Sequence, residues 1–312
     1  MKKNMDIIEQ AAKRLAELRR SGVDVPAQEP VPPAKPVSVV APAGKTDVPE
    51  VPQAVASSSR RIELDMDTIA RHGILTPRAE RSNLADELRV IKRPLLRNVA
   101  GKGVAPVKNG NLIMVTSAVP GEGKSFTAAN LAMSIAMELD HTVLLVDADV
   151  ARPSLPELFG LPPSKGLLDV LVNPETGLNQ VMLRTNIEKL SILPSGTRHP
   201  HATELLASDA MARLLDELAT RYSDRVIIFD SPPLLVTTEA RALASHMGQV
   251  VLVVRAERTT HAEVRHALSL IDVAPVKMLM LNQATGTGVS GHGYGYGYGY
   301  GYERKGDGGE GS

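Results

Sequence analysis

The sequence predicts an α/β fold in which helices cover both faces of a mainly parallel sheet, giving three layers. Segments of strand and helix character alternate from about residue 111 to residue 282, and the strand segments VLLVD and VIIFD are apolar up to their last position. Strands with two apolar faces are typical of parallel sheets, because helices bury them from both sides. With 43% hydrophobic residues, the composition provides the core that such a domain needs.

The first 22 residues predict a short amphipathic helix. Apolar residues recur at helical spacing from Met5 to Leu18, and charged residues fill the opposite face. Residues 1–20 carry six Lys or Arg and three Asp or Glu, a net charge of +3. The pattern suits a helix on a membrane surface or a partner helix, and a helix that packs on its own domain or on another copy explains it equally well.

Residues 23–59 predict an extended, semi-rigid linker, because prolines recur in AQEPVPPAKPVSVVAPAGK and no hydrophobic periodicity survives. Order returns near Arg60, and we expect one domain over residues 60–283. Its first long helix is LADELRVIKRPLLRN, which has an apolar stripe. We expect Pro94 to kink this helix or to end it at about Arg93.

Six strand segments follow, with helical segments between them. The strands are NLIMVTS, TVLLVDAD, LSILPS, RVIIFDSPP, QVVLVVRA and VKMLMLN, and the helices include SFTAANLAMSIAMEL, ATELLASDAMARLLDELATRY and AEVRHALSLID. The last strand, about residues 277–281, should run parallel to its neighbours, so that Asn282 lies at the edge where the other strands end. Residues 284–312 are dominated by Gly, Thr, Ser and Tyr, which predicts a mobile tail.

A phosphate-binding loop is predicted directly after the strand NLIMVTS. AVPGEGKSF matches the P-loop template, with Ala118 where the pattern most often has its first glycine. Glycines let backbone amides wrap around phosphate oxygens, and the following helix directs its positive end at them. Lys124 supplies a charge for the β- and γ-phosphates of a nucleotide, and the Ser125 hydroxyl is placed to ligate Mg²⁺. A Gly-rich turn that binds nothing is the alternative, against which the complete strand, loop, GKS and helix context argues. The residues expected to contact the nucleotide are Pro120, Gly121, Glu122, Gly123, Lys124, Ser125, Phe126 and Asn282.

Acidic residues end two of the buried strands. Asp147 and Asp149 follow one apolar run, and Asp230 follows another. Ligands of an open α/β sheet bind at the carboxyl ends of the strands, where the P-loop also lies, so we expect a cation beside these carboxylates. Asp230 is the expected magnesium carboxylate, while one of the other two would assist Mg²⁺ and one would accept a proton from an attacking hydroxyl. Their assignment stays open, and a helix cap or loop hydrogen bond is the alternative role for either.

Charge and cysteine content narrow the function classes. Lys plus Arg equals Asp plus Glu at 35 each, so no global field draws the chain to nucleic acid or an anionic bilayer, and any such binding would have to be local. The lack of cysteine excludes disulfides, thiolate metal sites and cysteine nucleophiles. Asp6 and Glu9 stand where a signal peptide would need an uninterrupted apolar region. No apolar run approaches the roughly 18 residues that are needed to span a bilayer. We expect a cytoplasmic protein that binds no nucleic acid.

Three motifs together resemble those of a known family. AVPGEGKS, VLLVDADVARP and VIIFDSPP occur in this order before a tyrosine-rich end, as in the bacterial tyrosine kinase (BY-kinase) family, which controls capsule and exopolysaccharide assembly. The resemblance runs from about Asp86 to the end, and SKGLLDVL, LSILPSG and ATELLASDAMARLL are also similar to the family. IKRPLL and TTEARALASHMGQVV are most similar to the autokinases of exosortase-type loci. The resemblance implies a three-layer P-loop NTPase fold, the cofactors ATP and Mg²⁺, and phosphate transfer to tyrosine.

The resemblance also implies roles for individual residues. Residues 118–125 correspond to the Walker A motif of the family, and Asp230 corresponds to its Walker B acid. The implied catalytic residues are Lys124, Asp147, Asp149 and Arg152, and the implied metal ligands are Ser125, Asp149 and Asp230.

The family's oligomerisation helix carries Glu-x-x-Arg-x-x-Arg, and this chain has Asp86, Arg89 and Lys92 at those positions. Lysine keeps the charge of arginine but not its planar fork, which weakens the expectation of the same ring contact.

Five of the six tyrosines alternate with glycine near the end of the chain; they are Tyr294, Tyr296, Tyr298, Tyr300 and Tyr302. A Gly-rich coil of about 16 residues, from Asn282 to the middle tyrosine, spans roughly 20 to 24 Å, which reaches the chain's own site or that of a neighbour. We interpret the tyrosines as substrate, and the family resemblance favours a neighbour in a homo-oligomer. A merely sticky or disordered terminus is the alternative.

The resemblance implies partners as well. Family members that cross the membrane carry that portion ahead of the kinase, whereas this chain does not. A separate inner-membrane co-polymerase of the chain-length determinant type is therefore expected to recruit the protein to the inner face, and a phosphotyrosine phosphatase to act on it. Two other classes remain: a non-kinase P-loop ATPase of the partition or cell-division type, whose extra early lysine is replaced here by Val119, and an interaction protein with an adhesive tail.

Overall fold

A computed structural model describes residues 60–77 and 82–284 of the 312-residue chain. The predicted N-terminal helix (1–22), the linker (23–59) and the tyrosines of the tail lie outside the described residues. The predicted domain from about residue 60 to residue 283 is therefore the part whose elements can be compared with the sequence.

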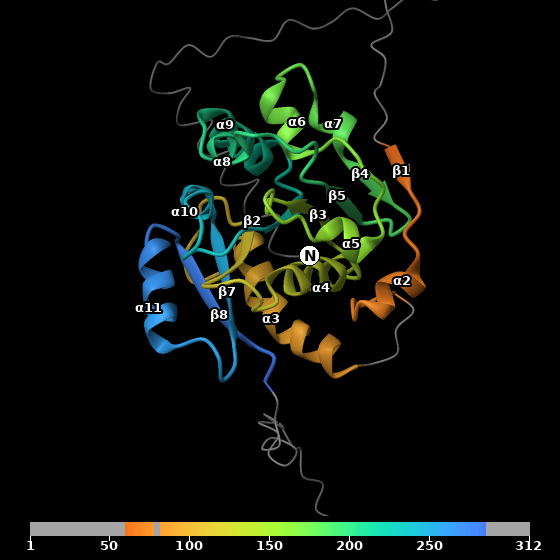
Figure 1. Ribbon diagram of the computed structural model, residues 1–312. Coiled ribbons are helices and arrows are strands. Elements are labelled where there is room, and N and C mark those ends of the chain that lie inside the picture. Colours follow the sequence, from red (N-terminus) through yellow and green to blue (C-terminus); the bar gives the residue numbers. More distant parts are fainter. Residues whose placement is uncertain (1–59, 78–81, 285–312) are drawn as a thin grey trace, which may run out of the picture. The chain divides into compact units, whose positions relative to one another are not determined.

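Within the described residues, eight strands form a single sheet of order β1-β4-β5-β3-β6-β2-β7-β8 (Figure 1). In that order the strands are β1 (Arg60–Ile62), β4 (Leu183–Thr185), β5 (Leu190–Leu193), β3 (Thr142–Asp147), β6 (Arg225–Asp230), β2 (Leu112–Ser117), β7 (Gln249–Arg255) and β8 (Val276–Asn282). The six strands from β5 to β8 are mutually parallel. β4 pairs antiparallel with β5, and β1 pairs parallel with β4, so these two strands run the other way. The predicted mainly parallel sheet is confirmed.

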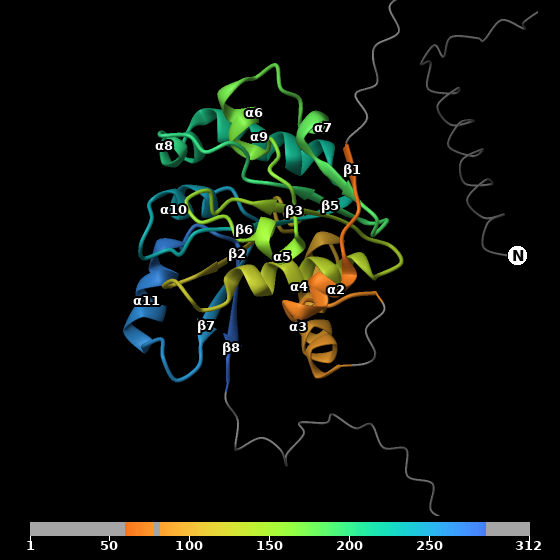
Figure 2. The ribbon, with the colours of Figure 1, turned by 45° about the vertical axis from the view of Figure 1, so that its right-hand side comes forward.

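Helices cover both faces of this sheet, which gives the predicted three layers (Figures 1 and 2). One face is covered by α2 (Met66–Arg71), α3 (Asn83–Val99), α4 (Lys124–Ala136) and α5 (Leu155–Phe159). The other face is covered by α6 (Leu167–Val172), α7 (Leu178–Val181), α8 (Ala202–Leu206), α9 (Asp209–Arg221), α10 (Glu239–Ala244) and α11 (His261–Leu270). Successive residues of β2 point to opposite faces, so Leu112 and Met114 join one core while Ile113 and Val115 join the other. This explains why the central strands are apolar throughout.

Two helix predictions need correction. Of the two alternatives for Pro94, an end of the helix at about Arg93 is wrong, because α3 runs through Pro94 to Val99. Proline removes the hydrogen bond to the carbonyl four residues earlier, that of Val90, and Val90 is 73% exposed, so water can take its place. The segment predicted as one helix over residues 202–222 is two helices. α8 ends at Leu206, and Ser208 begins α9 as its N-cap by accepting a hydrogen bond from the Met211 amide at 3.4 Å.

Within residues 60–77 and 82–284, no helix has both the length and the apolar character required to cross a bilayer.

Candidate active site

The strand register brings the three predicted carboxylates to one edge of the sheet. Asp147 ends β3 and lies directly beside Asp230, which ends β6. β6 in turn pairs with β2, whose end leads into the predicted P-loop. Asp149 follows two residues after β3 and is 4% exposed, while the other two are fully buried. Three acidic groups are thus enclosed where the parallel strands end.

The P-loop has the conformation that its glycines allow. Gly121 and Gly123 have φ angles of 84° and 91°, in the region that favours glycine. A Cβ atom on Gly123 would lie 2.2 Å from Nδ2 of Asn282, so a larger residue would have to displace that side chain as well as adopt a strained φ angle. α4 begins at the next residue, Lys124, and the first amides of a helix have no partner within the helix. The loop therefore presents amides and the positive end of α4 to the adjacent pocket.

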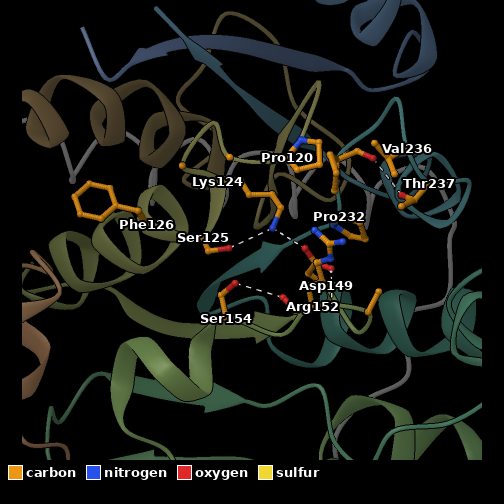
Figure 3. A pocket seen from close by; sticks show the side chains of 14 residues that line it. Pro120, Lys124, Ser125, Phe126, Asp149, Arg152, Ser154, Pro232, Val236 and Thr237 are labelled. Atoms are coloured by element: carbon orange, nitrogen blue, oxygen red, sulfur yellow. Dashed lines mark hydrogen bonds and ion pairs between the residues drawn. The ribbon is translucent and has the colours of Figure 1, made fainter. Parts of the chain in front are cut away.

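Lys124 contacts the acidic residues, and Figure 3 shows its ammonium directed at Asp149 and at the Ser125 hydroxyl. Its Nζ atom lies 2.6 Å from Oδ2 of Asp149 and 3.8 Å from Oδ1 of Asp230. The same atom lies 3.3 Å from the Ser125 hydroxyl. One ammonium thus faces three carboxyl groups, and the cluster is deficient in positive charge.

This imbalance shifts the pKa of each buried group. Burial, together with the neighbouring Asp230 and Asp149, raises the pKa of Asp147 well above its usual range. Burial also raises the pKa of Asp230 to about 6, although Lys124 and Ser125 oppose the shift. Burial acts to lower the pKa of Lys124, but the carboxylates of Asp230, Asp149 and Asp147 outweigh it and hold this pKa above its usual value. The site therefore favours an additional cation.

The residues present fit a bound Mg²⁺ ion. Both carboxylate oxygens of Asp147 and of Asp230 are buried and accept no hydrogen bond from the described residues. Buried carboxylates without a partner are costly unless a cation compensates them. The part of the chain that the structure describes holds no set of three carboxylate or imidazole groups that would bind a metal unaided. Mg²⁺ commonly uses only one or two carboxylates together with phosphate oxygens and water, so Ser125, Asp149 and Asp230 would hold it beside a nucleotide.

A pocket of about 390 Å³ opens onto this cluster (Figure 3). Its walls include six of the eight predicted nucleotide contacts, all in or next to the P-loop, and, from the second motif, Asp149 and Arg152. The opposite wall, which the sequence did not indicate, consists of Pro232, Pro233, Val236 and Thr237. This wall is fixed to the P-loop strand, since the Thr116 hydroxyl donates to the Pro232 carbonyl at 2.8 Å. The Pro-Pro pair at positions 232 and 233, separated from Asp230 by Ser231, was the signal in the sequence that could have identified it.

Glu122 and Asn282, two predicted nucleotide contacts, are placed differently from the glycines and Lys124. The Glu122 side chain is 1% exposed and turned into the protein. Its carboxylate accepts hydrogen bonds from the Val119 amide at 2.8 Å, from the Arg255 amide at 3.2 Å and from the Thr259 hydroxyl. Asn282 donates through Nδ2 to the Glu122 carbonyl at 2.8 Å. Both side chains thus support the P-loop from behind, and only the backbone of Glu122 remains available to phosphate.

The Glu122 contacts lead to a prediction. Glu122→Gln should lower the free energy of unfolding by about 1 to 3 kcal/mol and weaken ADP binding. The glutamine side chain has an NH₂ group where glutamate has a second acceptor oxygen, and this group would face the three donors that now bind the carboxylate. Thermal unfolding and calorimetric titration with ADP measure the two effects. The matched control is Glu257→Gln, the same change at an exposed position in the loop between β7 and α11, which also contains Thr259. Equal ADP affinity in both variants would show that the carboxylate does not hold the loop.

The raised pKa of Asp230 predicts how stability changes with pH. Its folded pKa of about 6 exceeds the ordinary value of 3.8, so between these values the folded chain holds a proton that the unfolded chain has lost. The stabilisation is fully present below pH 3.8 and is lost as pH rises through about 6. In chelator and without nucleotide, Asp230→Asn should therefore flatten the decline in melting temperature between about pH 4 and pH 6. An unchanged slope would contradict the raised pKa of this buried carboxyl group.

The predicted oligomerisation residues lie on α3. Asp86 and Arg89 are exposed and form an ion pair of 2.6 Å with each other. Lys92 is buried instead: its Nζ donates to the Ser134 carbonyl at 2.8 Å and lies 2.5 Å from the Glu138 carboxylate. The side chain of Lys92 is therefore engaged within its own protomer, whereas Asp86 and Arg89 remain accessible to another copy.

Comparison with known proteins places this site in a family. The family model described as ParA, NUBPL iron-transfer P-loop NTPase, matches residues 108–283. The tyrosine-protein kinase YwqD of Bacillus subtilis is 36% identical over 167 residues, which are 54% of this chain and 69% of YwqD. The putative tyrosine-protein kinase EpsB of Ralstonia nicotianae is 36% identical over 168 residues, but the match spans only 22% of that longer protein.

A solved structure agrees with these relatives. The crystal structure of the chimerical protein CapA2B2 superposes with a TM-score of 0.56 at 30% identity, over 71% of this chain and 93% of that one. The P-loop, the carboxylates that end β3 and β6, and the similarity to YwqD over most of its length lead to the same conclusion: the chain is a P-loop NTPase that belongs to the bacterial tyrosine kinase family.

Proposed function

We propose that the chain is an ATP-dependent tyrosine autokinase whose substrate is its own tyrosine-rich end. The convergence of Lys124, Asp149 and Asp230 beside the P-loop is the observation that carries this proposal. The site combines amides for phosphates, a lysine for their charge and carboxylates for a magnesium ion, which are the parts that phosphoryl transfer requires. Bound Mg²⁺ would supply charge neutralisation at the phosphates.

The chain's own residues would prepare the acceptor. A tyrosine hydroxyl gives its proton to a carboxylate, its oxygen bonds to the γ-phosphorus, and the bond from that phosphorus to the β-phosphate oxygen breaks to release ADP. Asp149 lines the pocket whereas Asp147 is fully buried, which favours Asp149 as the group that meets the phenol. Once phosphates attract Lys124 away, Asp149 is free for this role, and Ser125 and Asp230 would then hold the Mg²⁺ ion. Arg152, an exposed residue of the same pocket, would orient the phosphate or the acceptor.

The geometry of β8 supports the tail as substrate. β8 is parallel to β7 and ends at Asn282, whose side chain touches the P-loop. The chain therefore leaves the domain at the edge where the nucleotide would bind. We propose that the tyrosines react in the site of a neighbouring copy, since Asp86 and Arg89 offer an exposed surface for assembly.

This proposal includes a biological setting. Family membership favours a role in exopolysaccharide polymerisation and export, together with a membrane co-polymerase that recruits the kinase and a phosphatase that resets it. We further propose that the chain belongs to the exosortase-associated branch, on the segments IKRPLL and TTEARALASHMGQVV.

Mixing two variants, neither of which can phosphorylate its own tail, tests the proposal. One chain carries Lys124→Met with its tail intact, and the other has an intact site with all five tail tyrosines changed to phenylalanine. With ATP and Mg²⁺, the first chain should become phosphorylated on tyrosine only when the second is present, and ATP binding by the second should be normal. Phosphotyrosine on the chain with the phenylalanine tail would argue against the tail as the substrate, and a mixture without phosphotyrosine would argue against transfer between copies.

The non-kinase ATPase is the second candidate, because the family model matching residues 108–283 is named for ParA. It predicts ADP release without protein phosphorylation.

A further inference from the structure

A second charged cavity lies at the opposite edge of the sheet from the proposed active site. It has a volume of about 890 Å³ and is lined where β3, β5 and β6 begin, at Thr142, Leu190 and Arg225. The nucleotide site lies where β3 and β6 end. We call it the basic cavity, defined by its five cationic residues: Arg60, Arg61, Arg184, Lys189 and Arg225.

The basic cavity has an excess of positive charge. Glu188 is the one carboxylate among its lining residues, which leaves a net charge of +4 in a chain that is formally neutral. Among the described residues, none of the five cations lies within 4.0 Å of a carboxylate oxygen. The strand register also pairs Arg61 of β1 directly with Arg184 of β4. Like charges in facing positions destabilise a sheet, so an anion beside this exposed pair would relieve the repulsion.

Exposed apolar side chains accompany the charge. The Lys189 ammonium donates to the carbonyls of Glu138 and Leu139 at 2.8 and 2.6 Å, which places this turn beside the cavity. The Leu139 side chain is 86% exposed, and that of nearby Met137 is 41% exposed. Arginines next to an exposed leucine match a bilayer, whose anionic headgroups meet the charge while its interior receives the apolar side chain.

We propose that the basic cavity docks directly on an anionic lipid surface. A phosphorylated peptide would satisfy the arginines but leaves the exposed Leu139 without a role. The chain also enters the domain at Arg60, and residues 1–20 before it carry a net charge of +3, the sign that the same surface attracts. Docked in this way, the protein directs the ends of β3 and β6, with the nucleotide site, away from the bilayer.

Vesicle sedimentation of the full chain, without nucleotide, tests this docking. Wild-type protein should bind vesicles of phosphatidylcholine mixed with phosphatidylglycerol and should not bind phosphatidylcholine alone. Arg61→Glu/Arg184→Glu should weaken this binding by about tenfold or more. The matched control is Arg213→Glu/Arg265→Glu, which makes the same charge change at exposed positions on α9 and α11. Leu139→Ser should also weaken binding, whereas Val273→Ser, at a position 69% exposed, should not.

Three results would overturn the proposal. Unchanged vesicle binding in Arg61→Glu/Arg184→Glu would remove the cavity from any lipid contact. Equal losses in both charge-reversal pairs would indicate an effect of net charge alone. The third result concerns a tyrosine-phosphorylated Gly-Tyr peptide tested without vesicles. If only Arg61→Glu/Arg184→Glu abolishes binding of this peptide, and the same variant still binds vesicles, the cavity would be assigned to a phosphopeptide. Circular dichroism and ADP binding confirm that each variant folds, and the absence of ATP separates this result from the fate of the kinase proposal.

Discussion

Lys124→Met should reduce autophosphorylation by more than about a hundredfold, because Lys124 is the one cation among residues 60–77 and 82–284 that pairs with Asp149 and Asp230. Methionine has a similar length but no charge, so the γ-phosphate loses its electrostatic partner during transfer. Phosphotyrosine formed per minute with ATP and Mg²⁺ is the measurement. Lys102→Met, an exposed change after α3, is the control and should leave the rate unchanged.

The same substitution should destabilise the nucleotide-free protein. Lys124 lies within ion-pair distance of Asp149 and Asp230, and the nearby carboxylate of Asp147 also raises the pKa of Lys124. Removal of the ammonium therefore leaves three acidic groups without a compensating charge. Loss of one partner of a buried ion pair costs about 3 to 5 kcal/mol, part of which protonation of the carboxyls would recover. A variant that keeps both its melting temperature and its kinase rate would contradict the central role of Lys124.

Asp230→Asn should change stability and activity in opposite directions. At pH 7 the folded chain must keep this fully buried carboxylate ionised against a pKa of about 6, compared with 3.8 when unfolded. Removing the charge should therefore stabilise the nucleotide-free protein by up to about 3 kcal/mol. Kinase activity should fall by more than about a hundredfold, because the proposed magnesium site loses a ligand.

Melting temperature and phosphotyrosine formation on the same preparation test this pair of effects. Asp216→Asn, at an exposed position on α9, is the control for a carboxylate that faces solvent. A less stable Asp230→Asn variant would indicate that this carboxylate is satisfied within the chain, and full activity would exclude it from the metal site.

Much of the fold could be predicted because its signals are local. Each of the six parallel strands is a run of four or more residues with strong apolar character, and the P-loop is a contiguous motif. β1 and β4 contain three residues each, which is too short for alternation to be recognised. These two strands exist through their pairing with distant parts of the chain, which a single sequence does not reveal.

The candidate site shows the same division. The convergence of Lys124 with the strand-end carboxylates followed from the parallel sheet, since parallel strands end at one edge. The orientation of Glu122 could not be predicted, because its partner Thr259 lies 137 positions away. Lys92 was similarly expected at a subunit contact, but packing of α3 on α4 places its ammonium against Glu138 and Ser134. Residue type and spacing specify which groups are present, and tertiary contacts decide where they point.

The ratio of phosphotyrosine formed to ADP released tests the central claim most directly. The full chain is incubated with Mg·ATP, both products are quantified over time, and the phosphorylated positions are mapped by mass spectrometry. A kinase that phosphorylates its own tail predicts a ratio near unity until the sites fill, with phosphate on the tyrosines between residues 294 and 302 and none in Lys124→Met. Steady ADP release without phosphotyrosine would contradict the account and identify a P-loop ATPase instead.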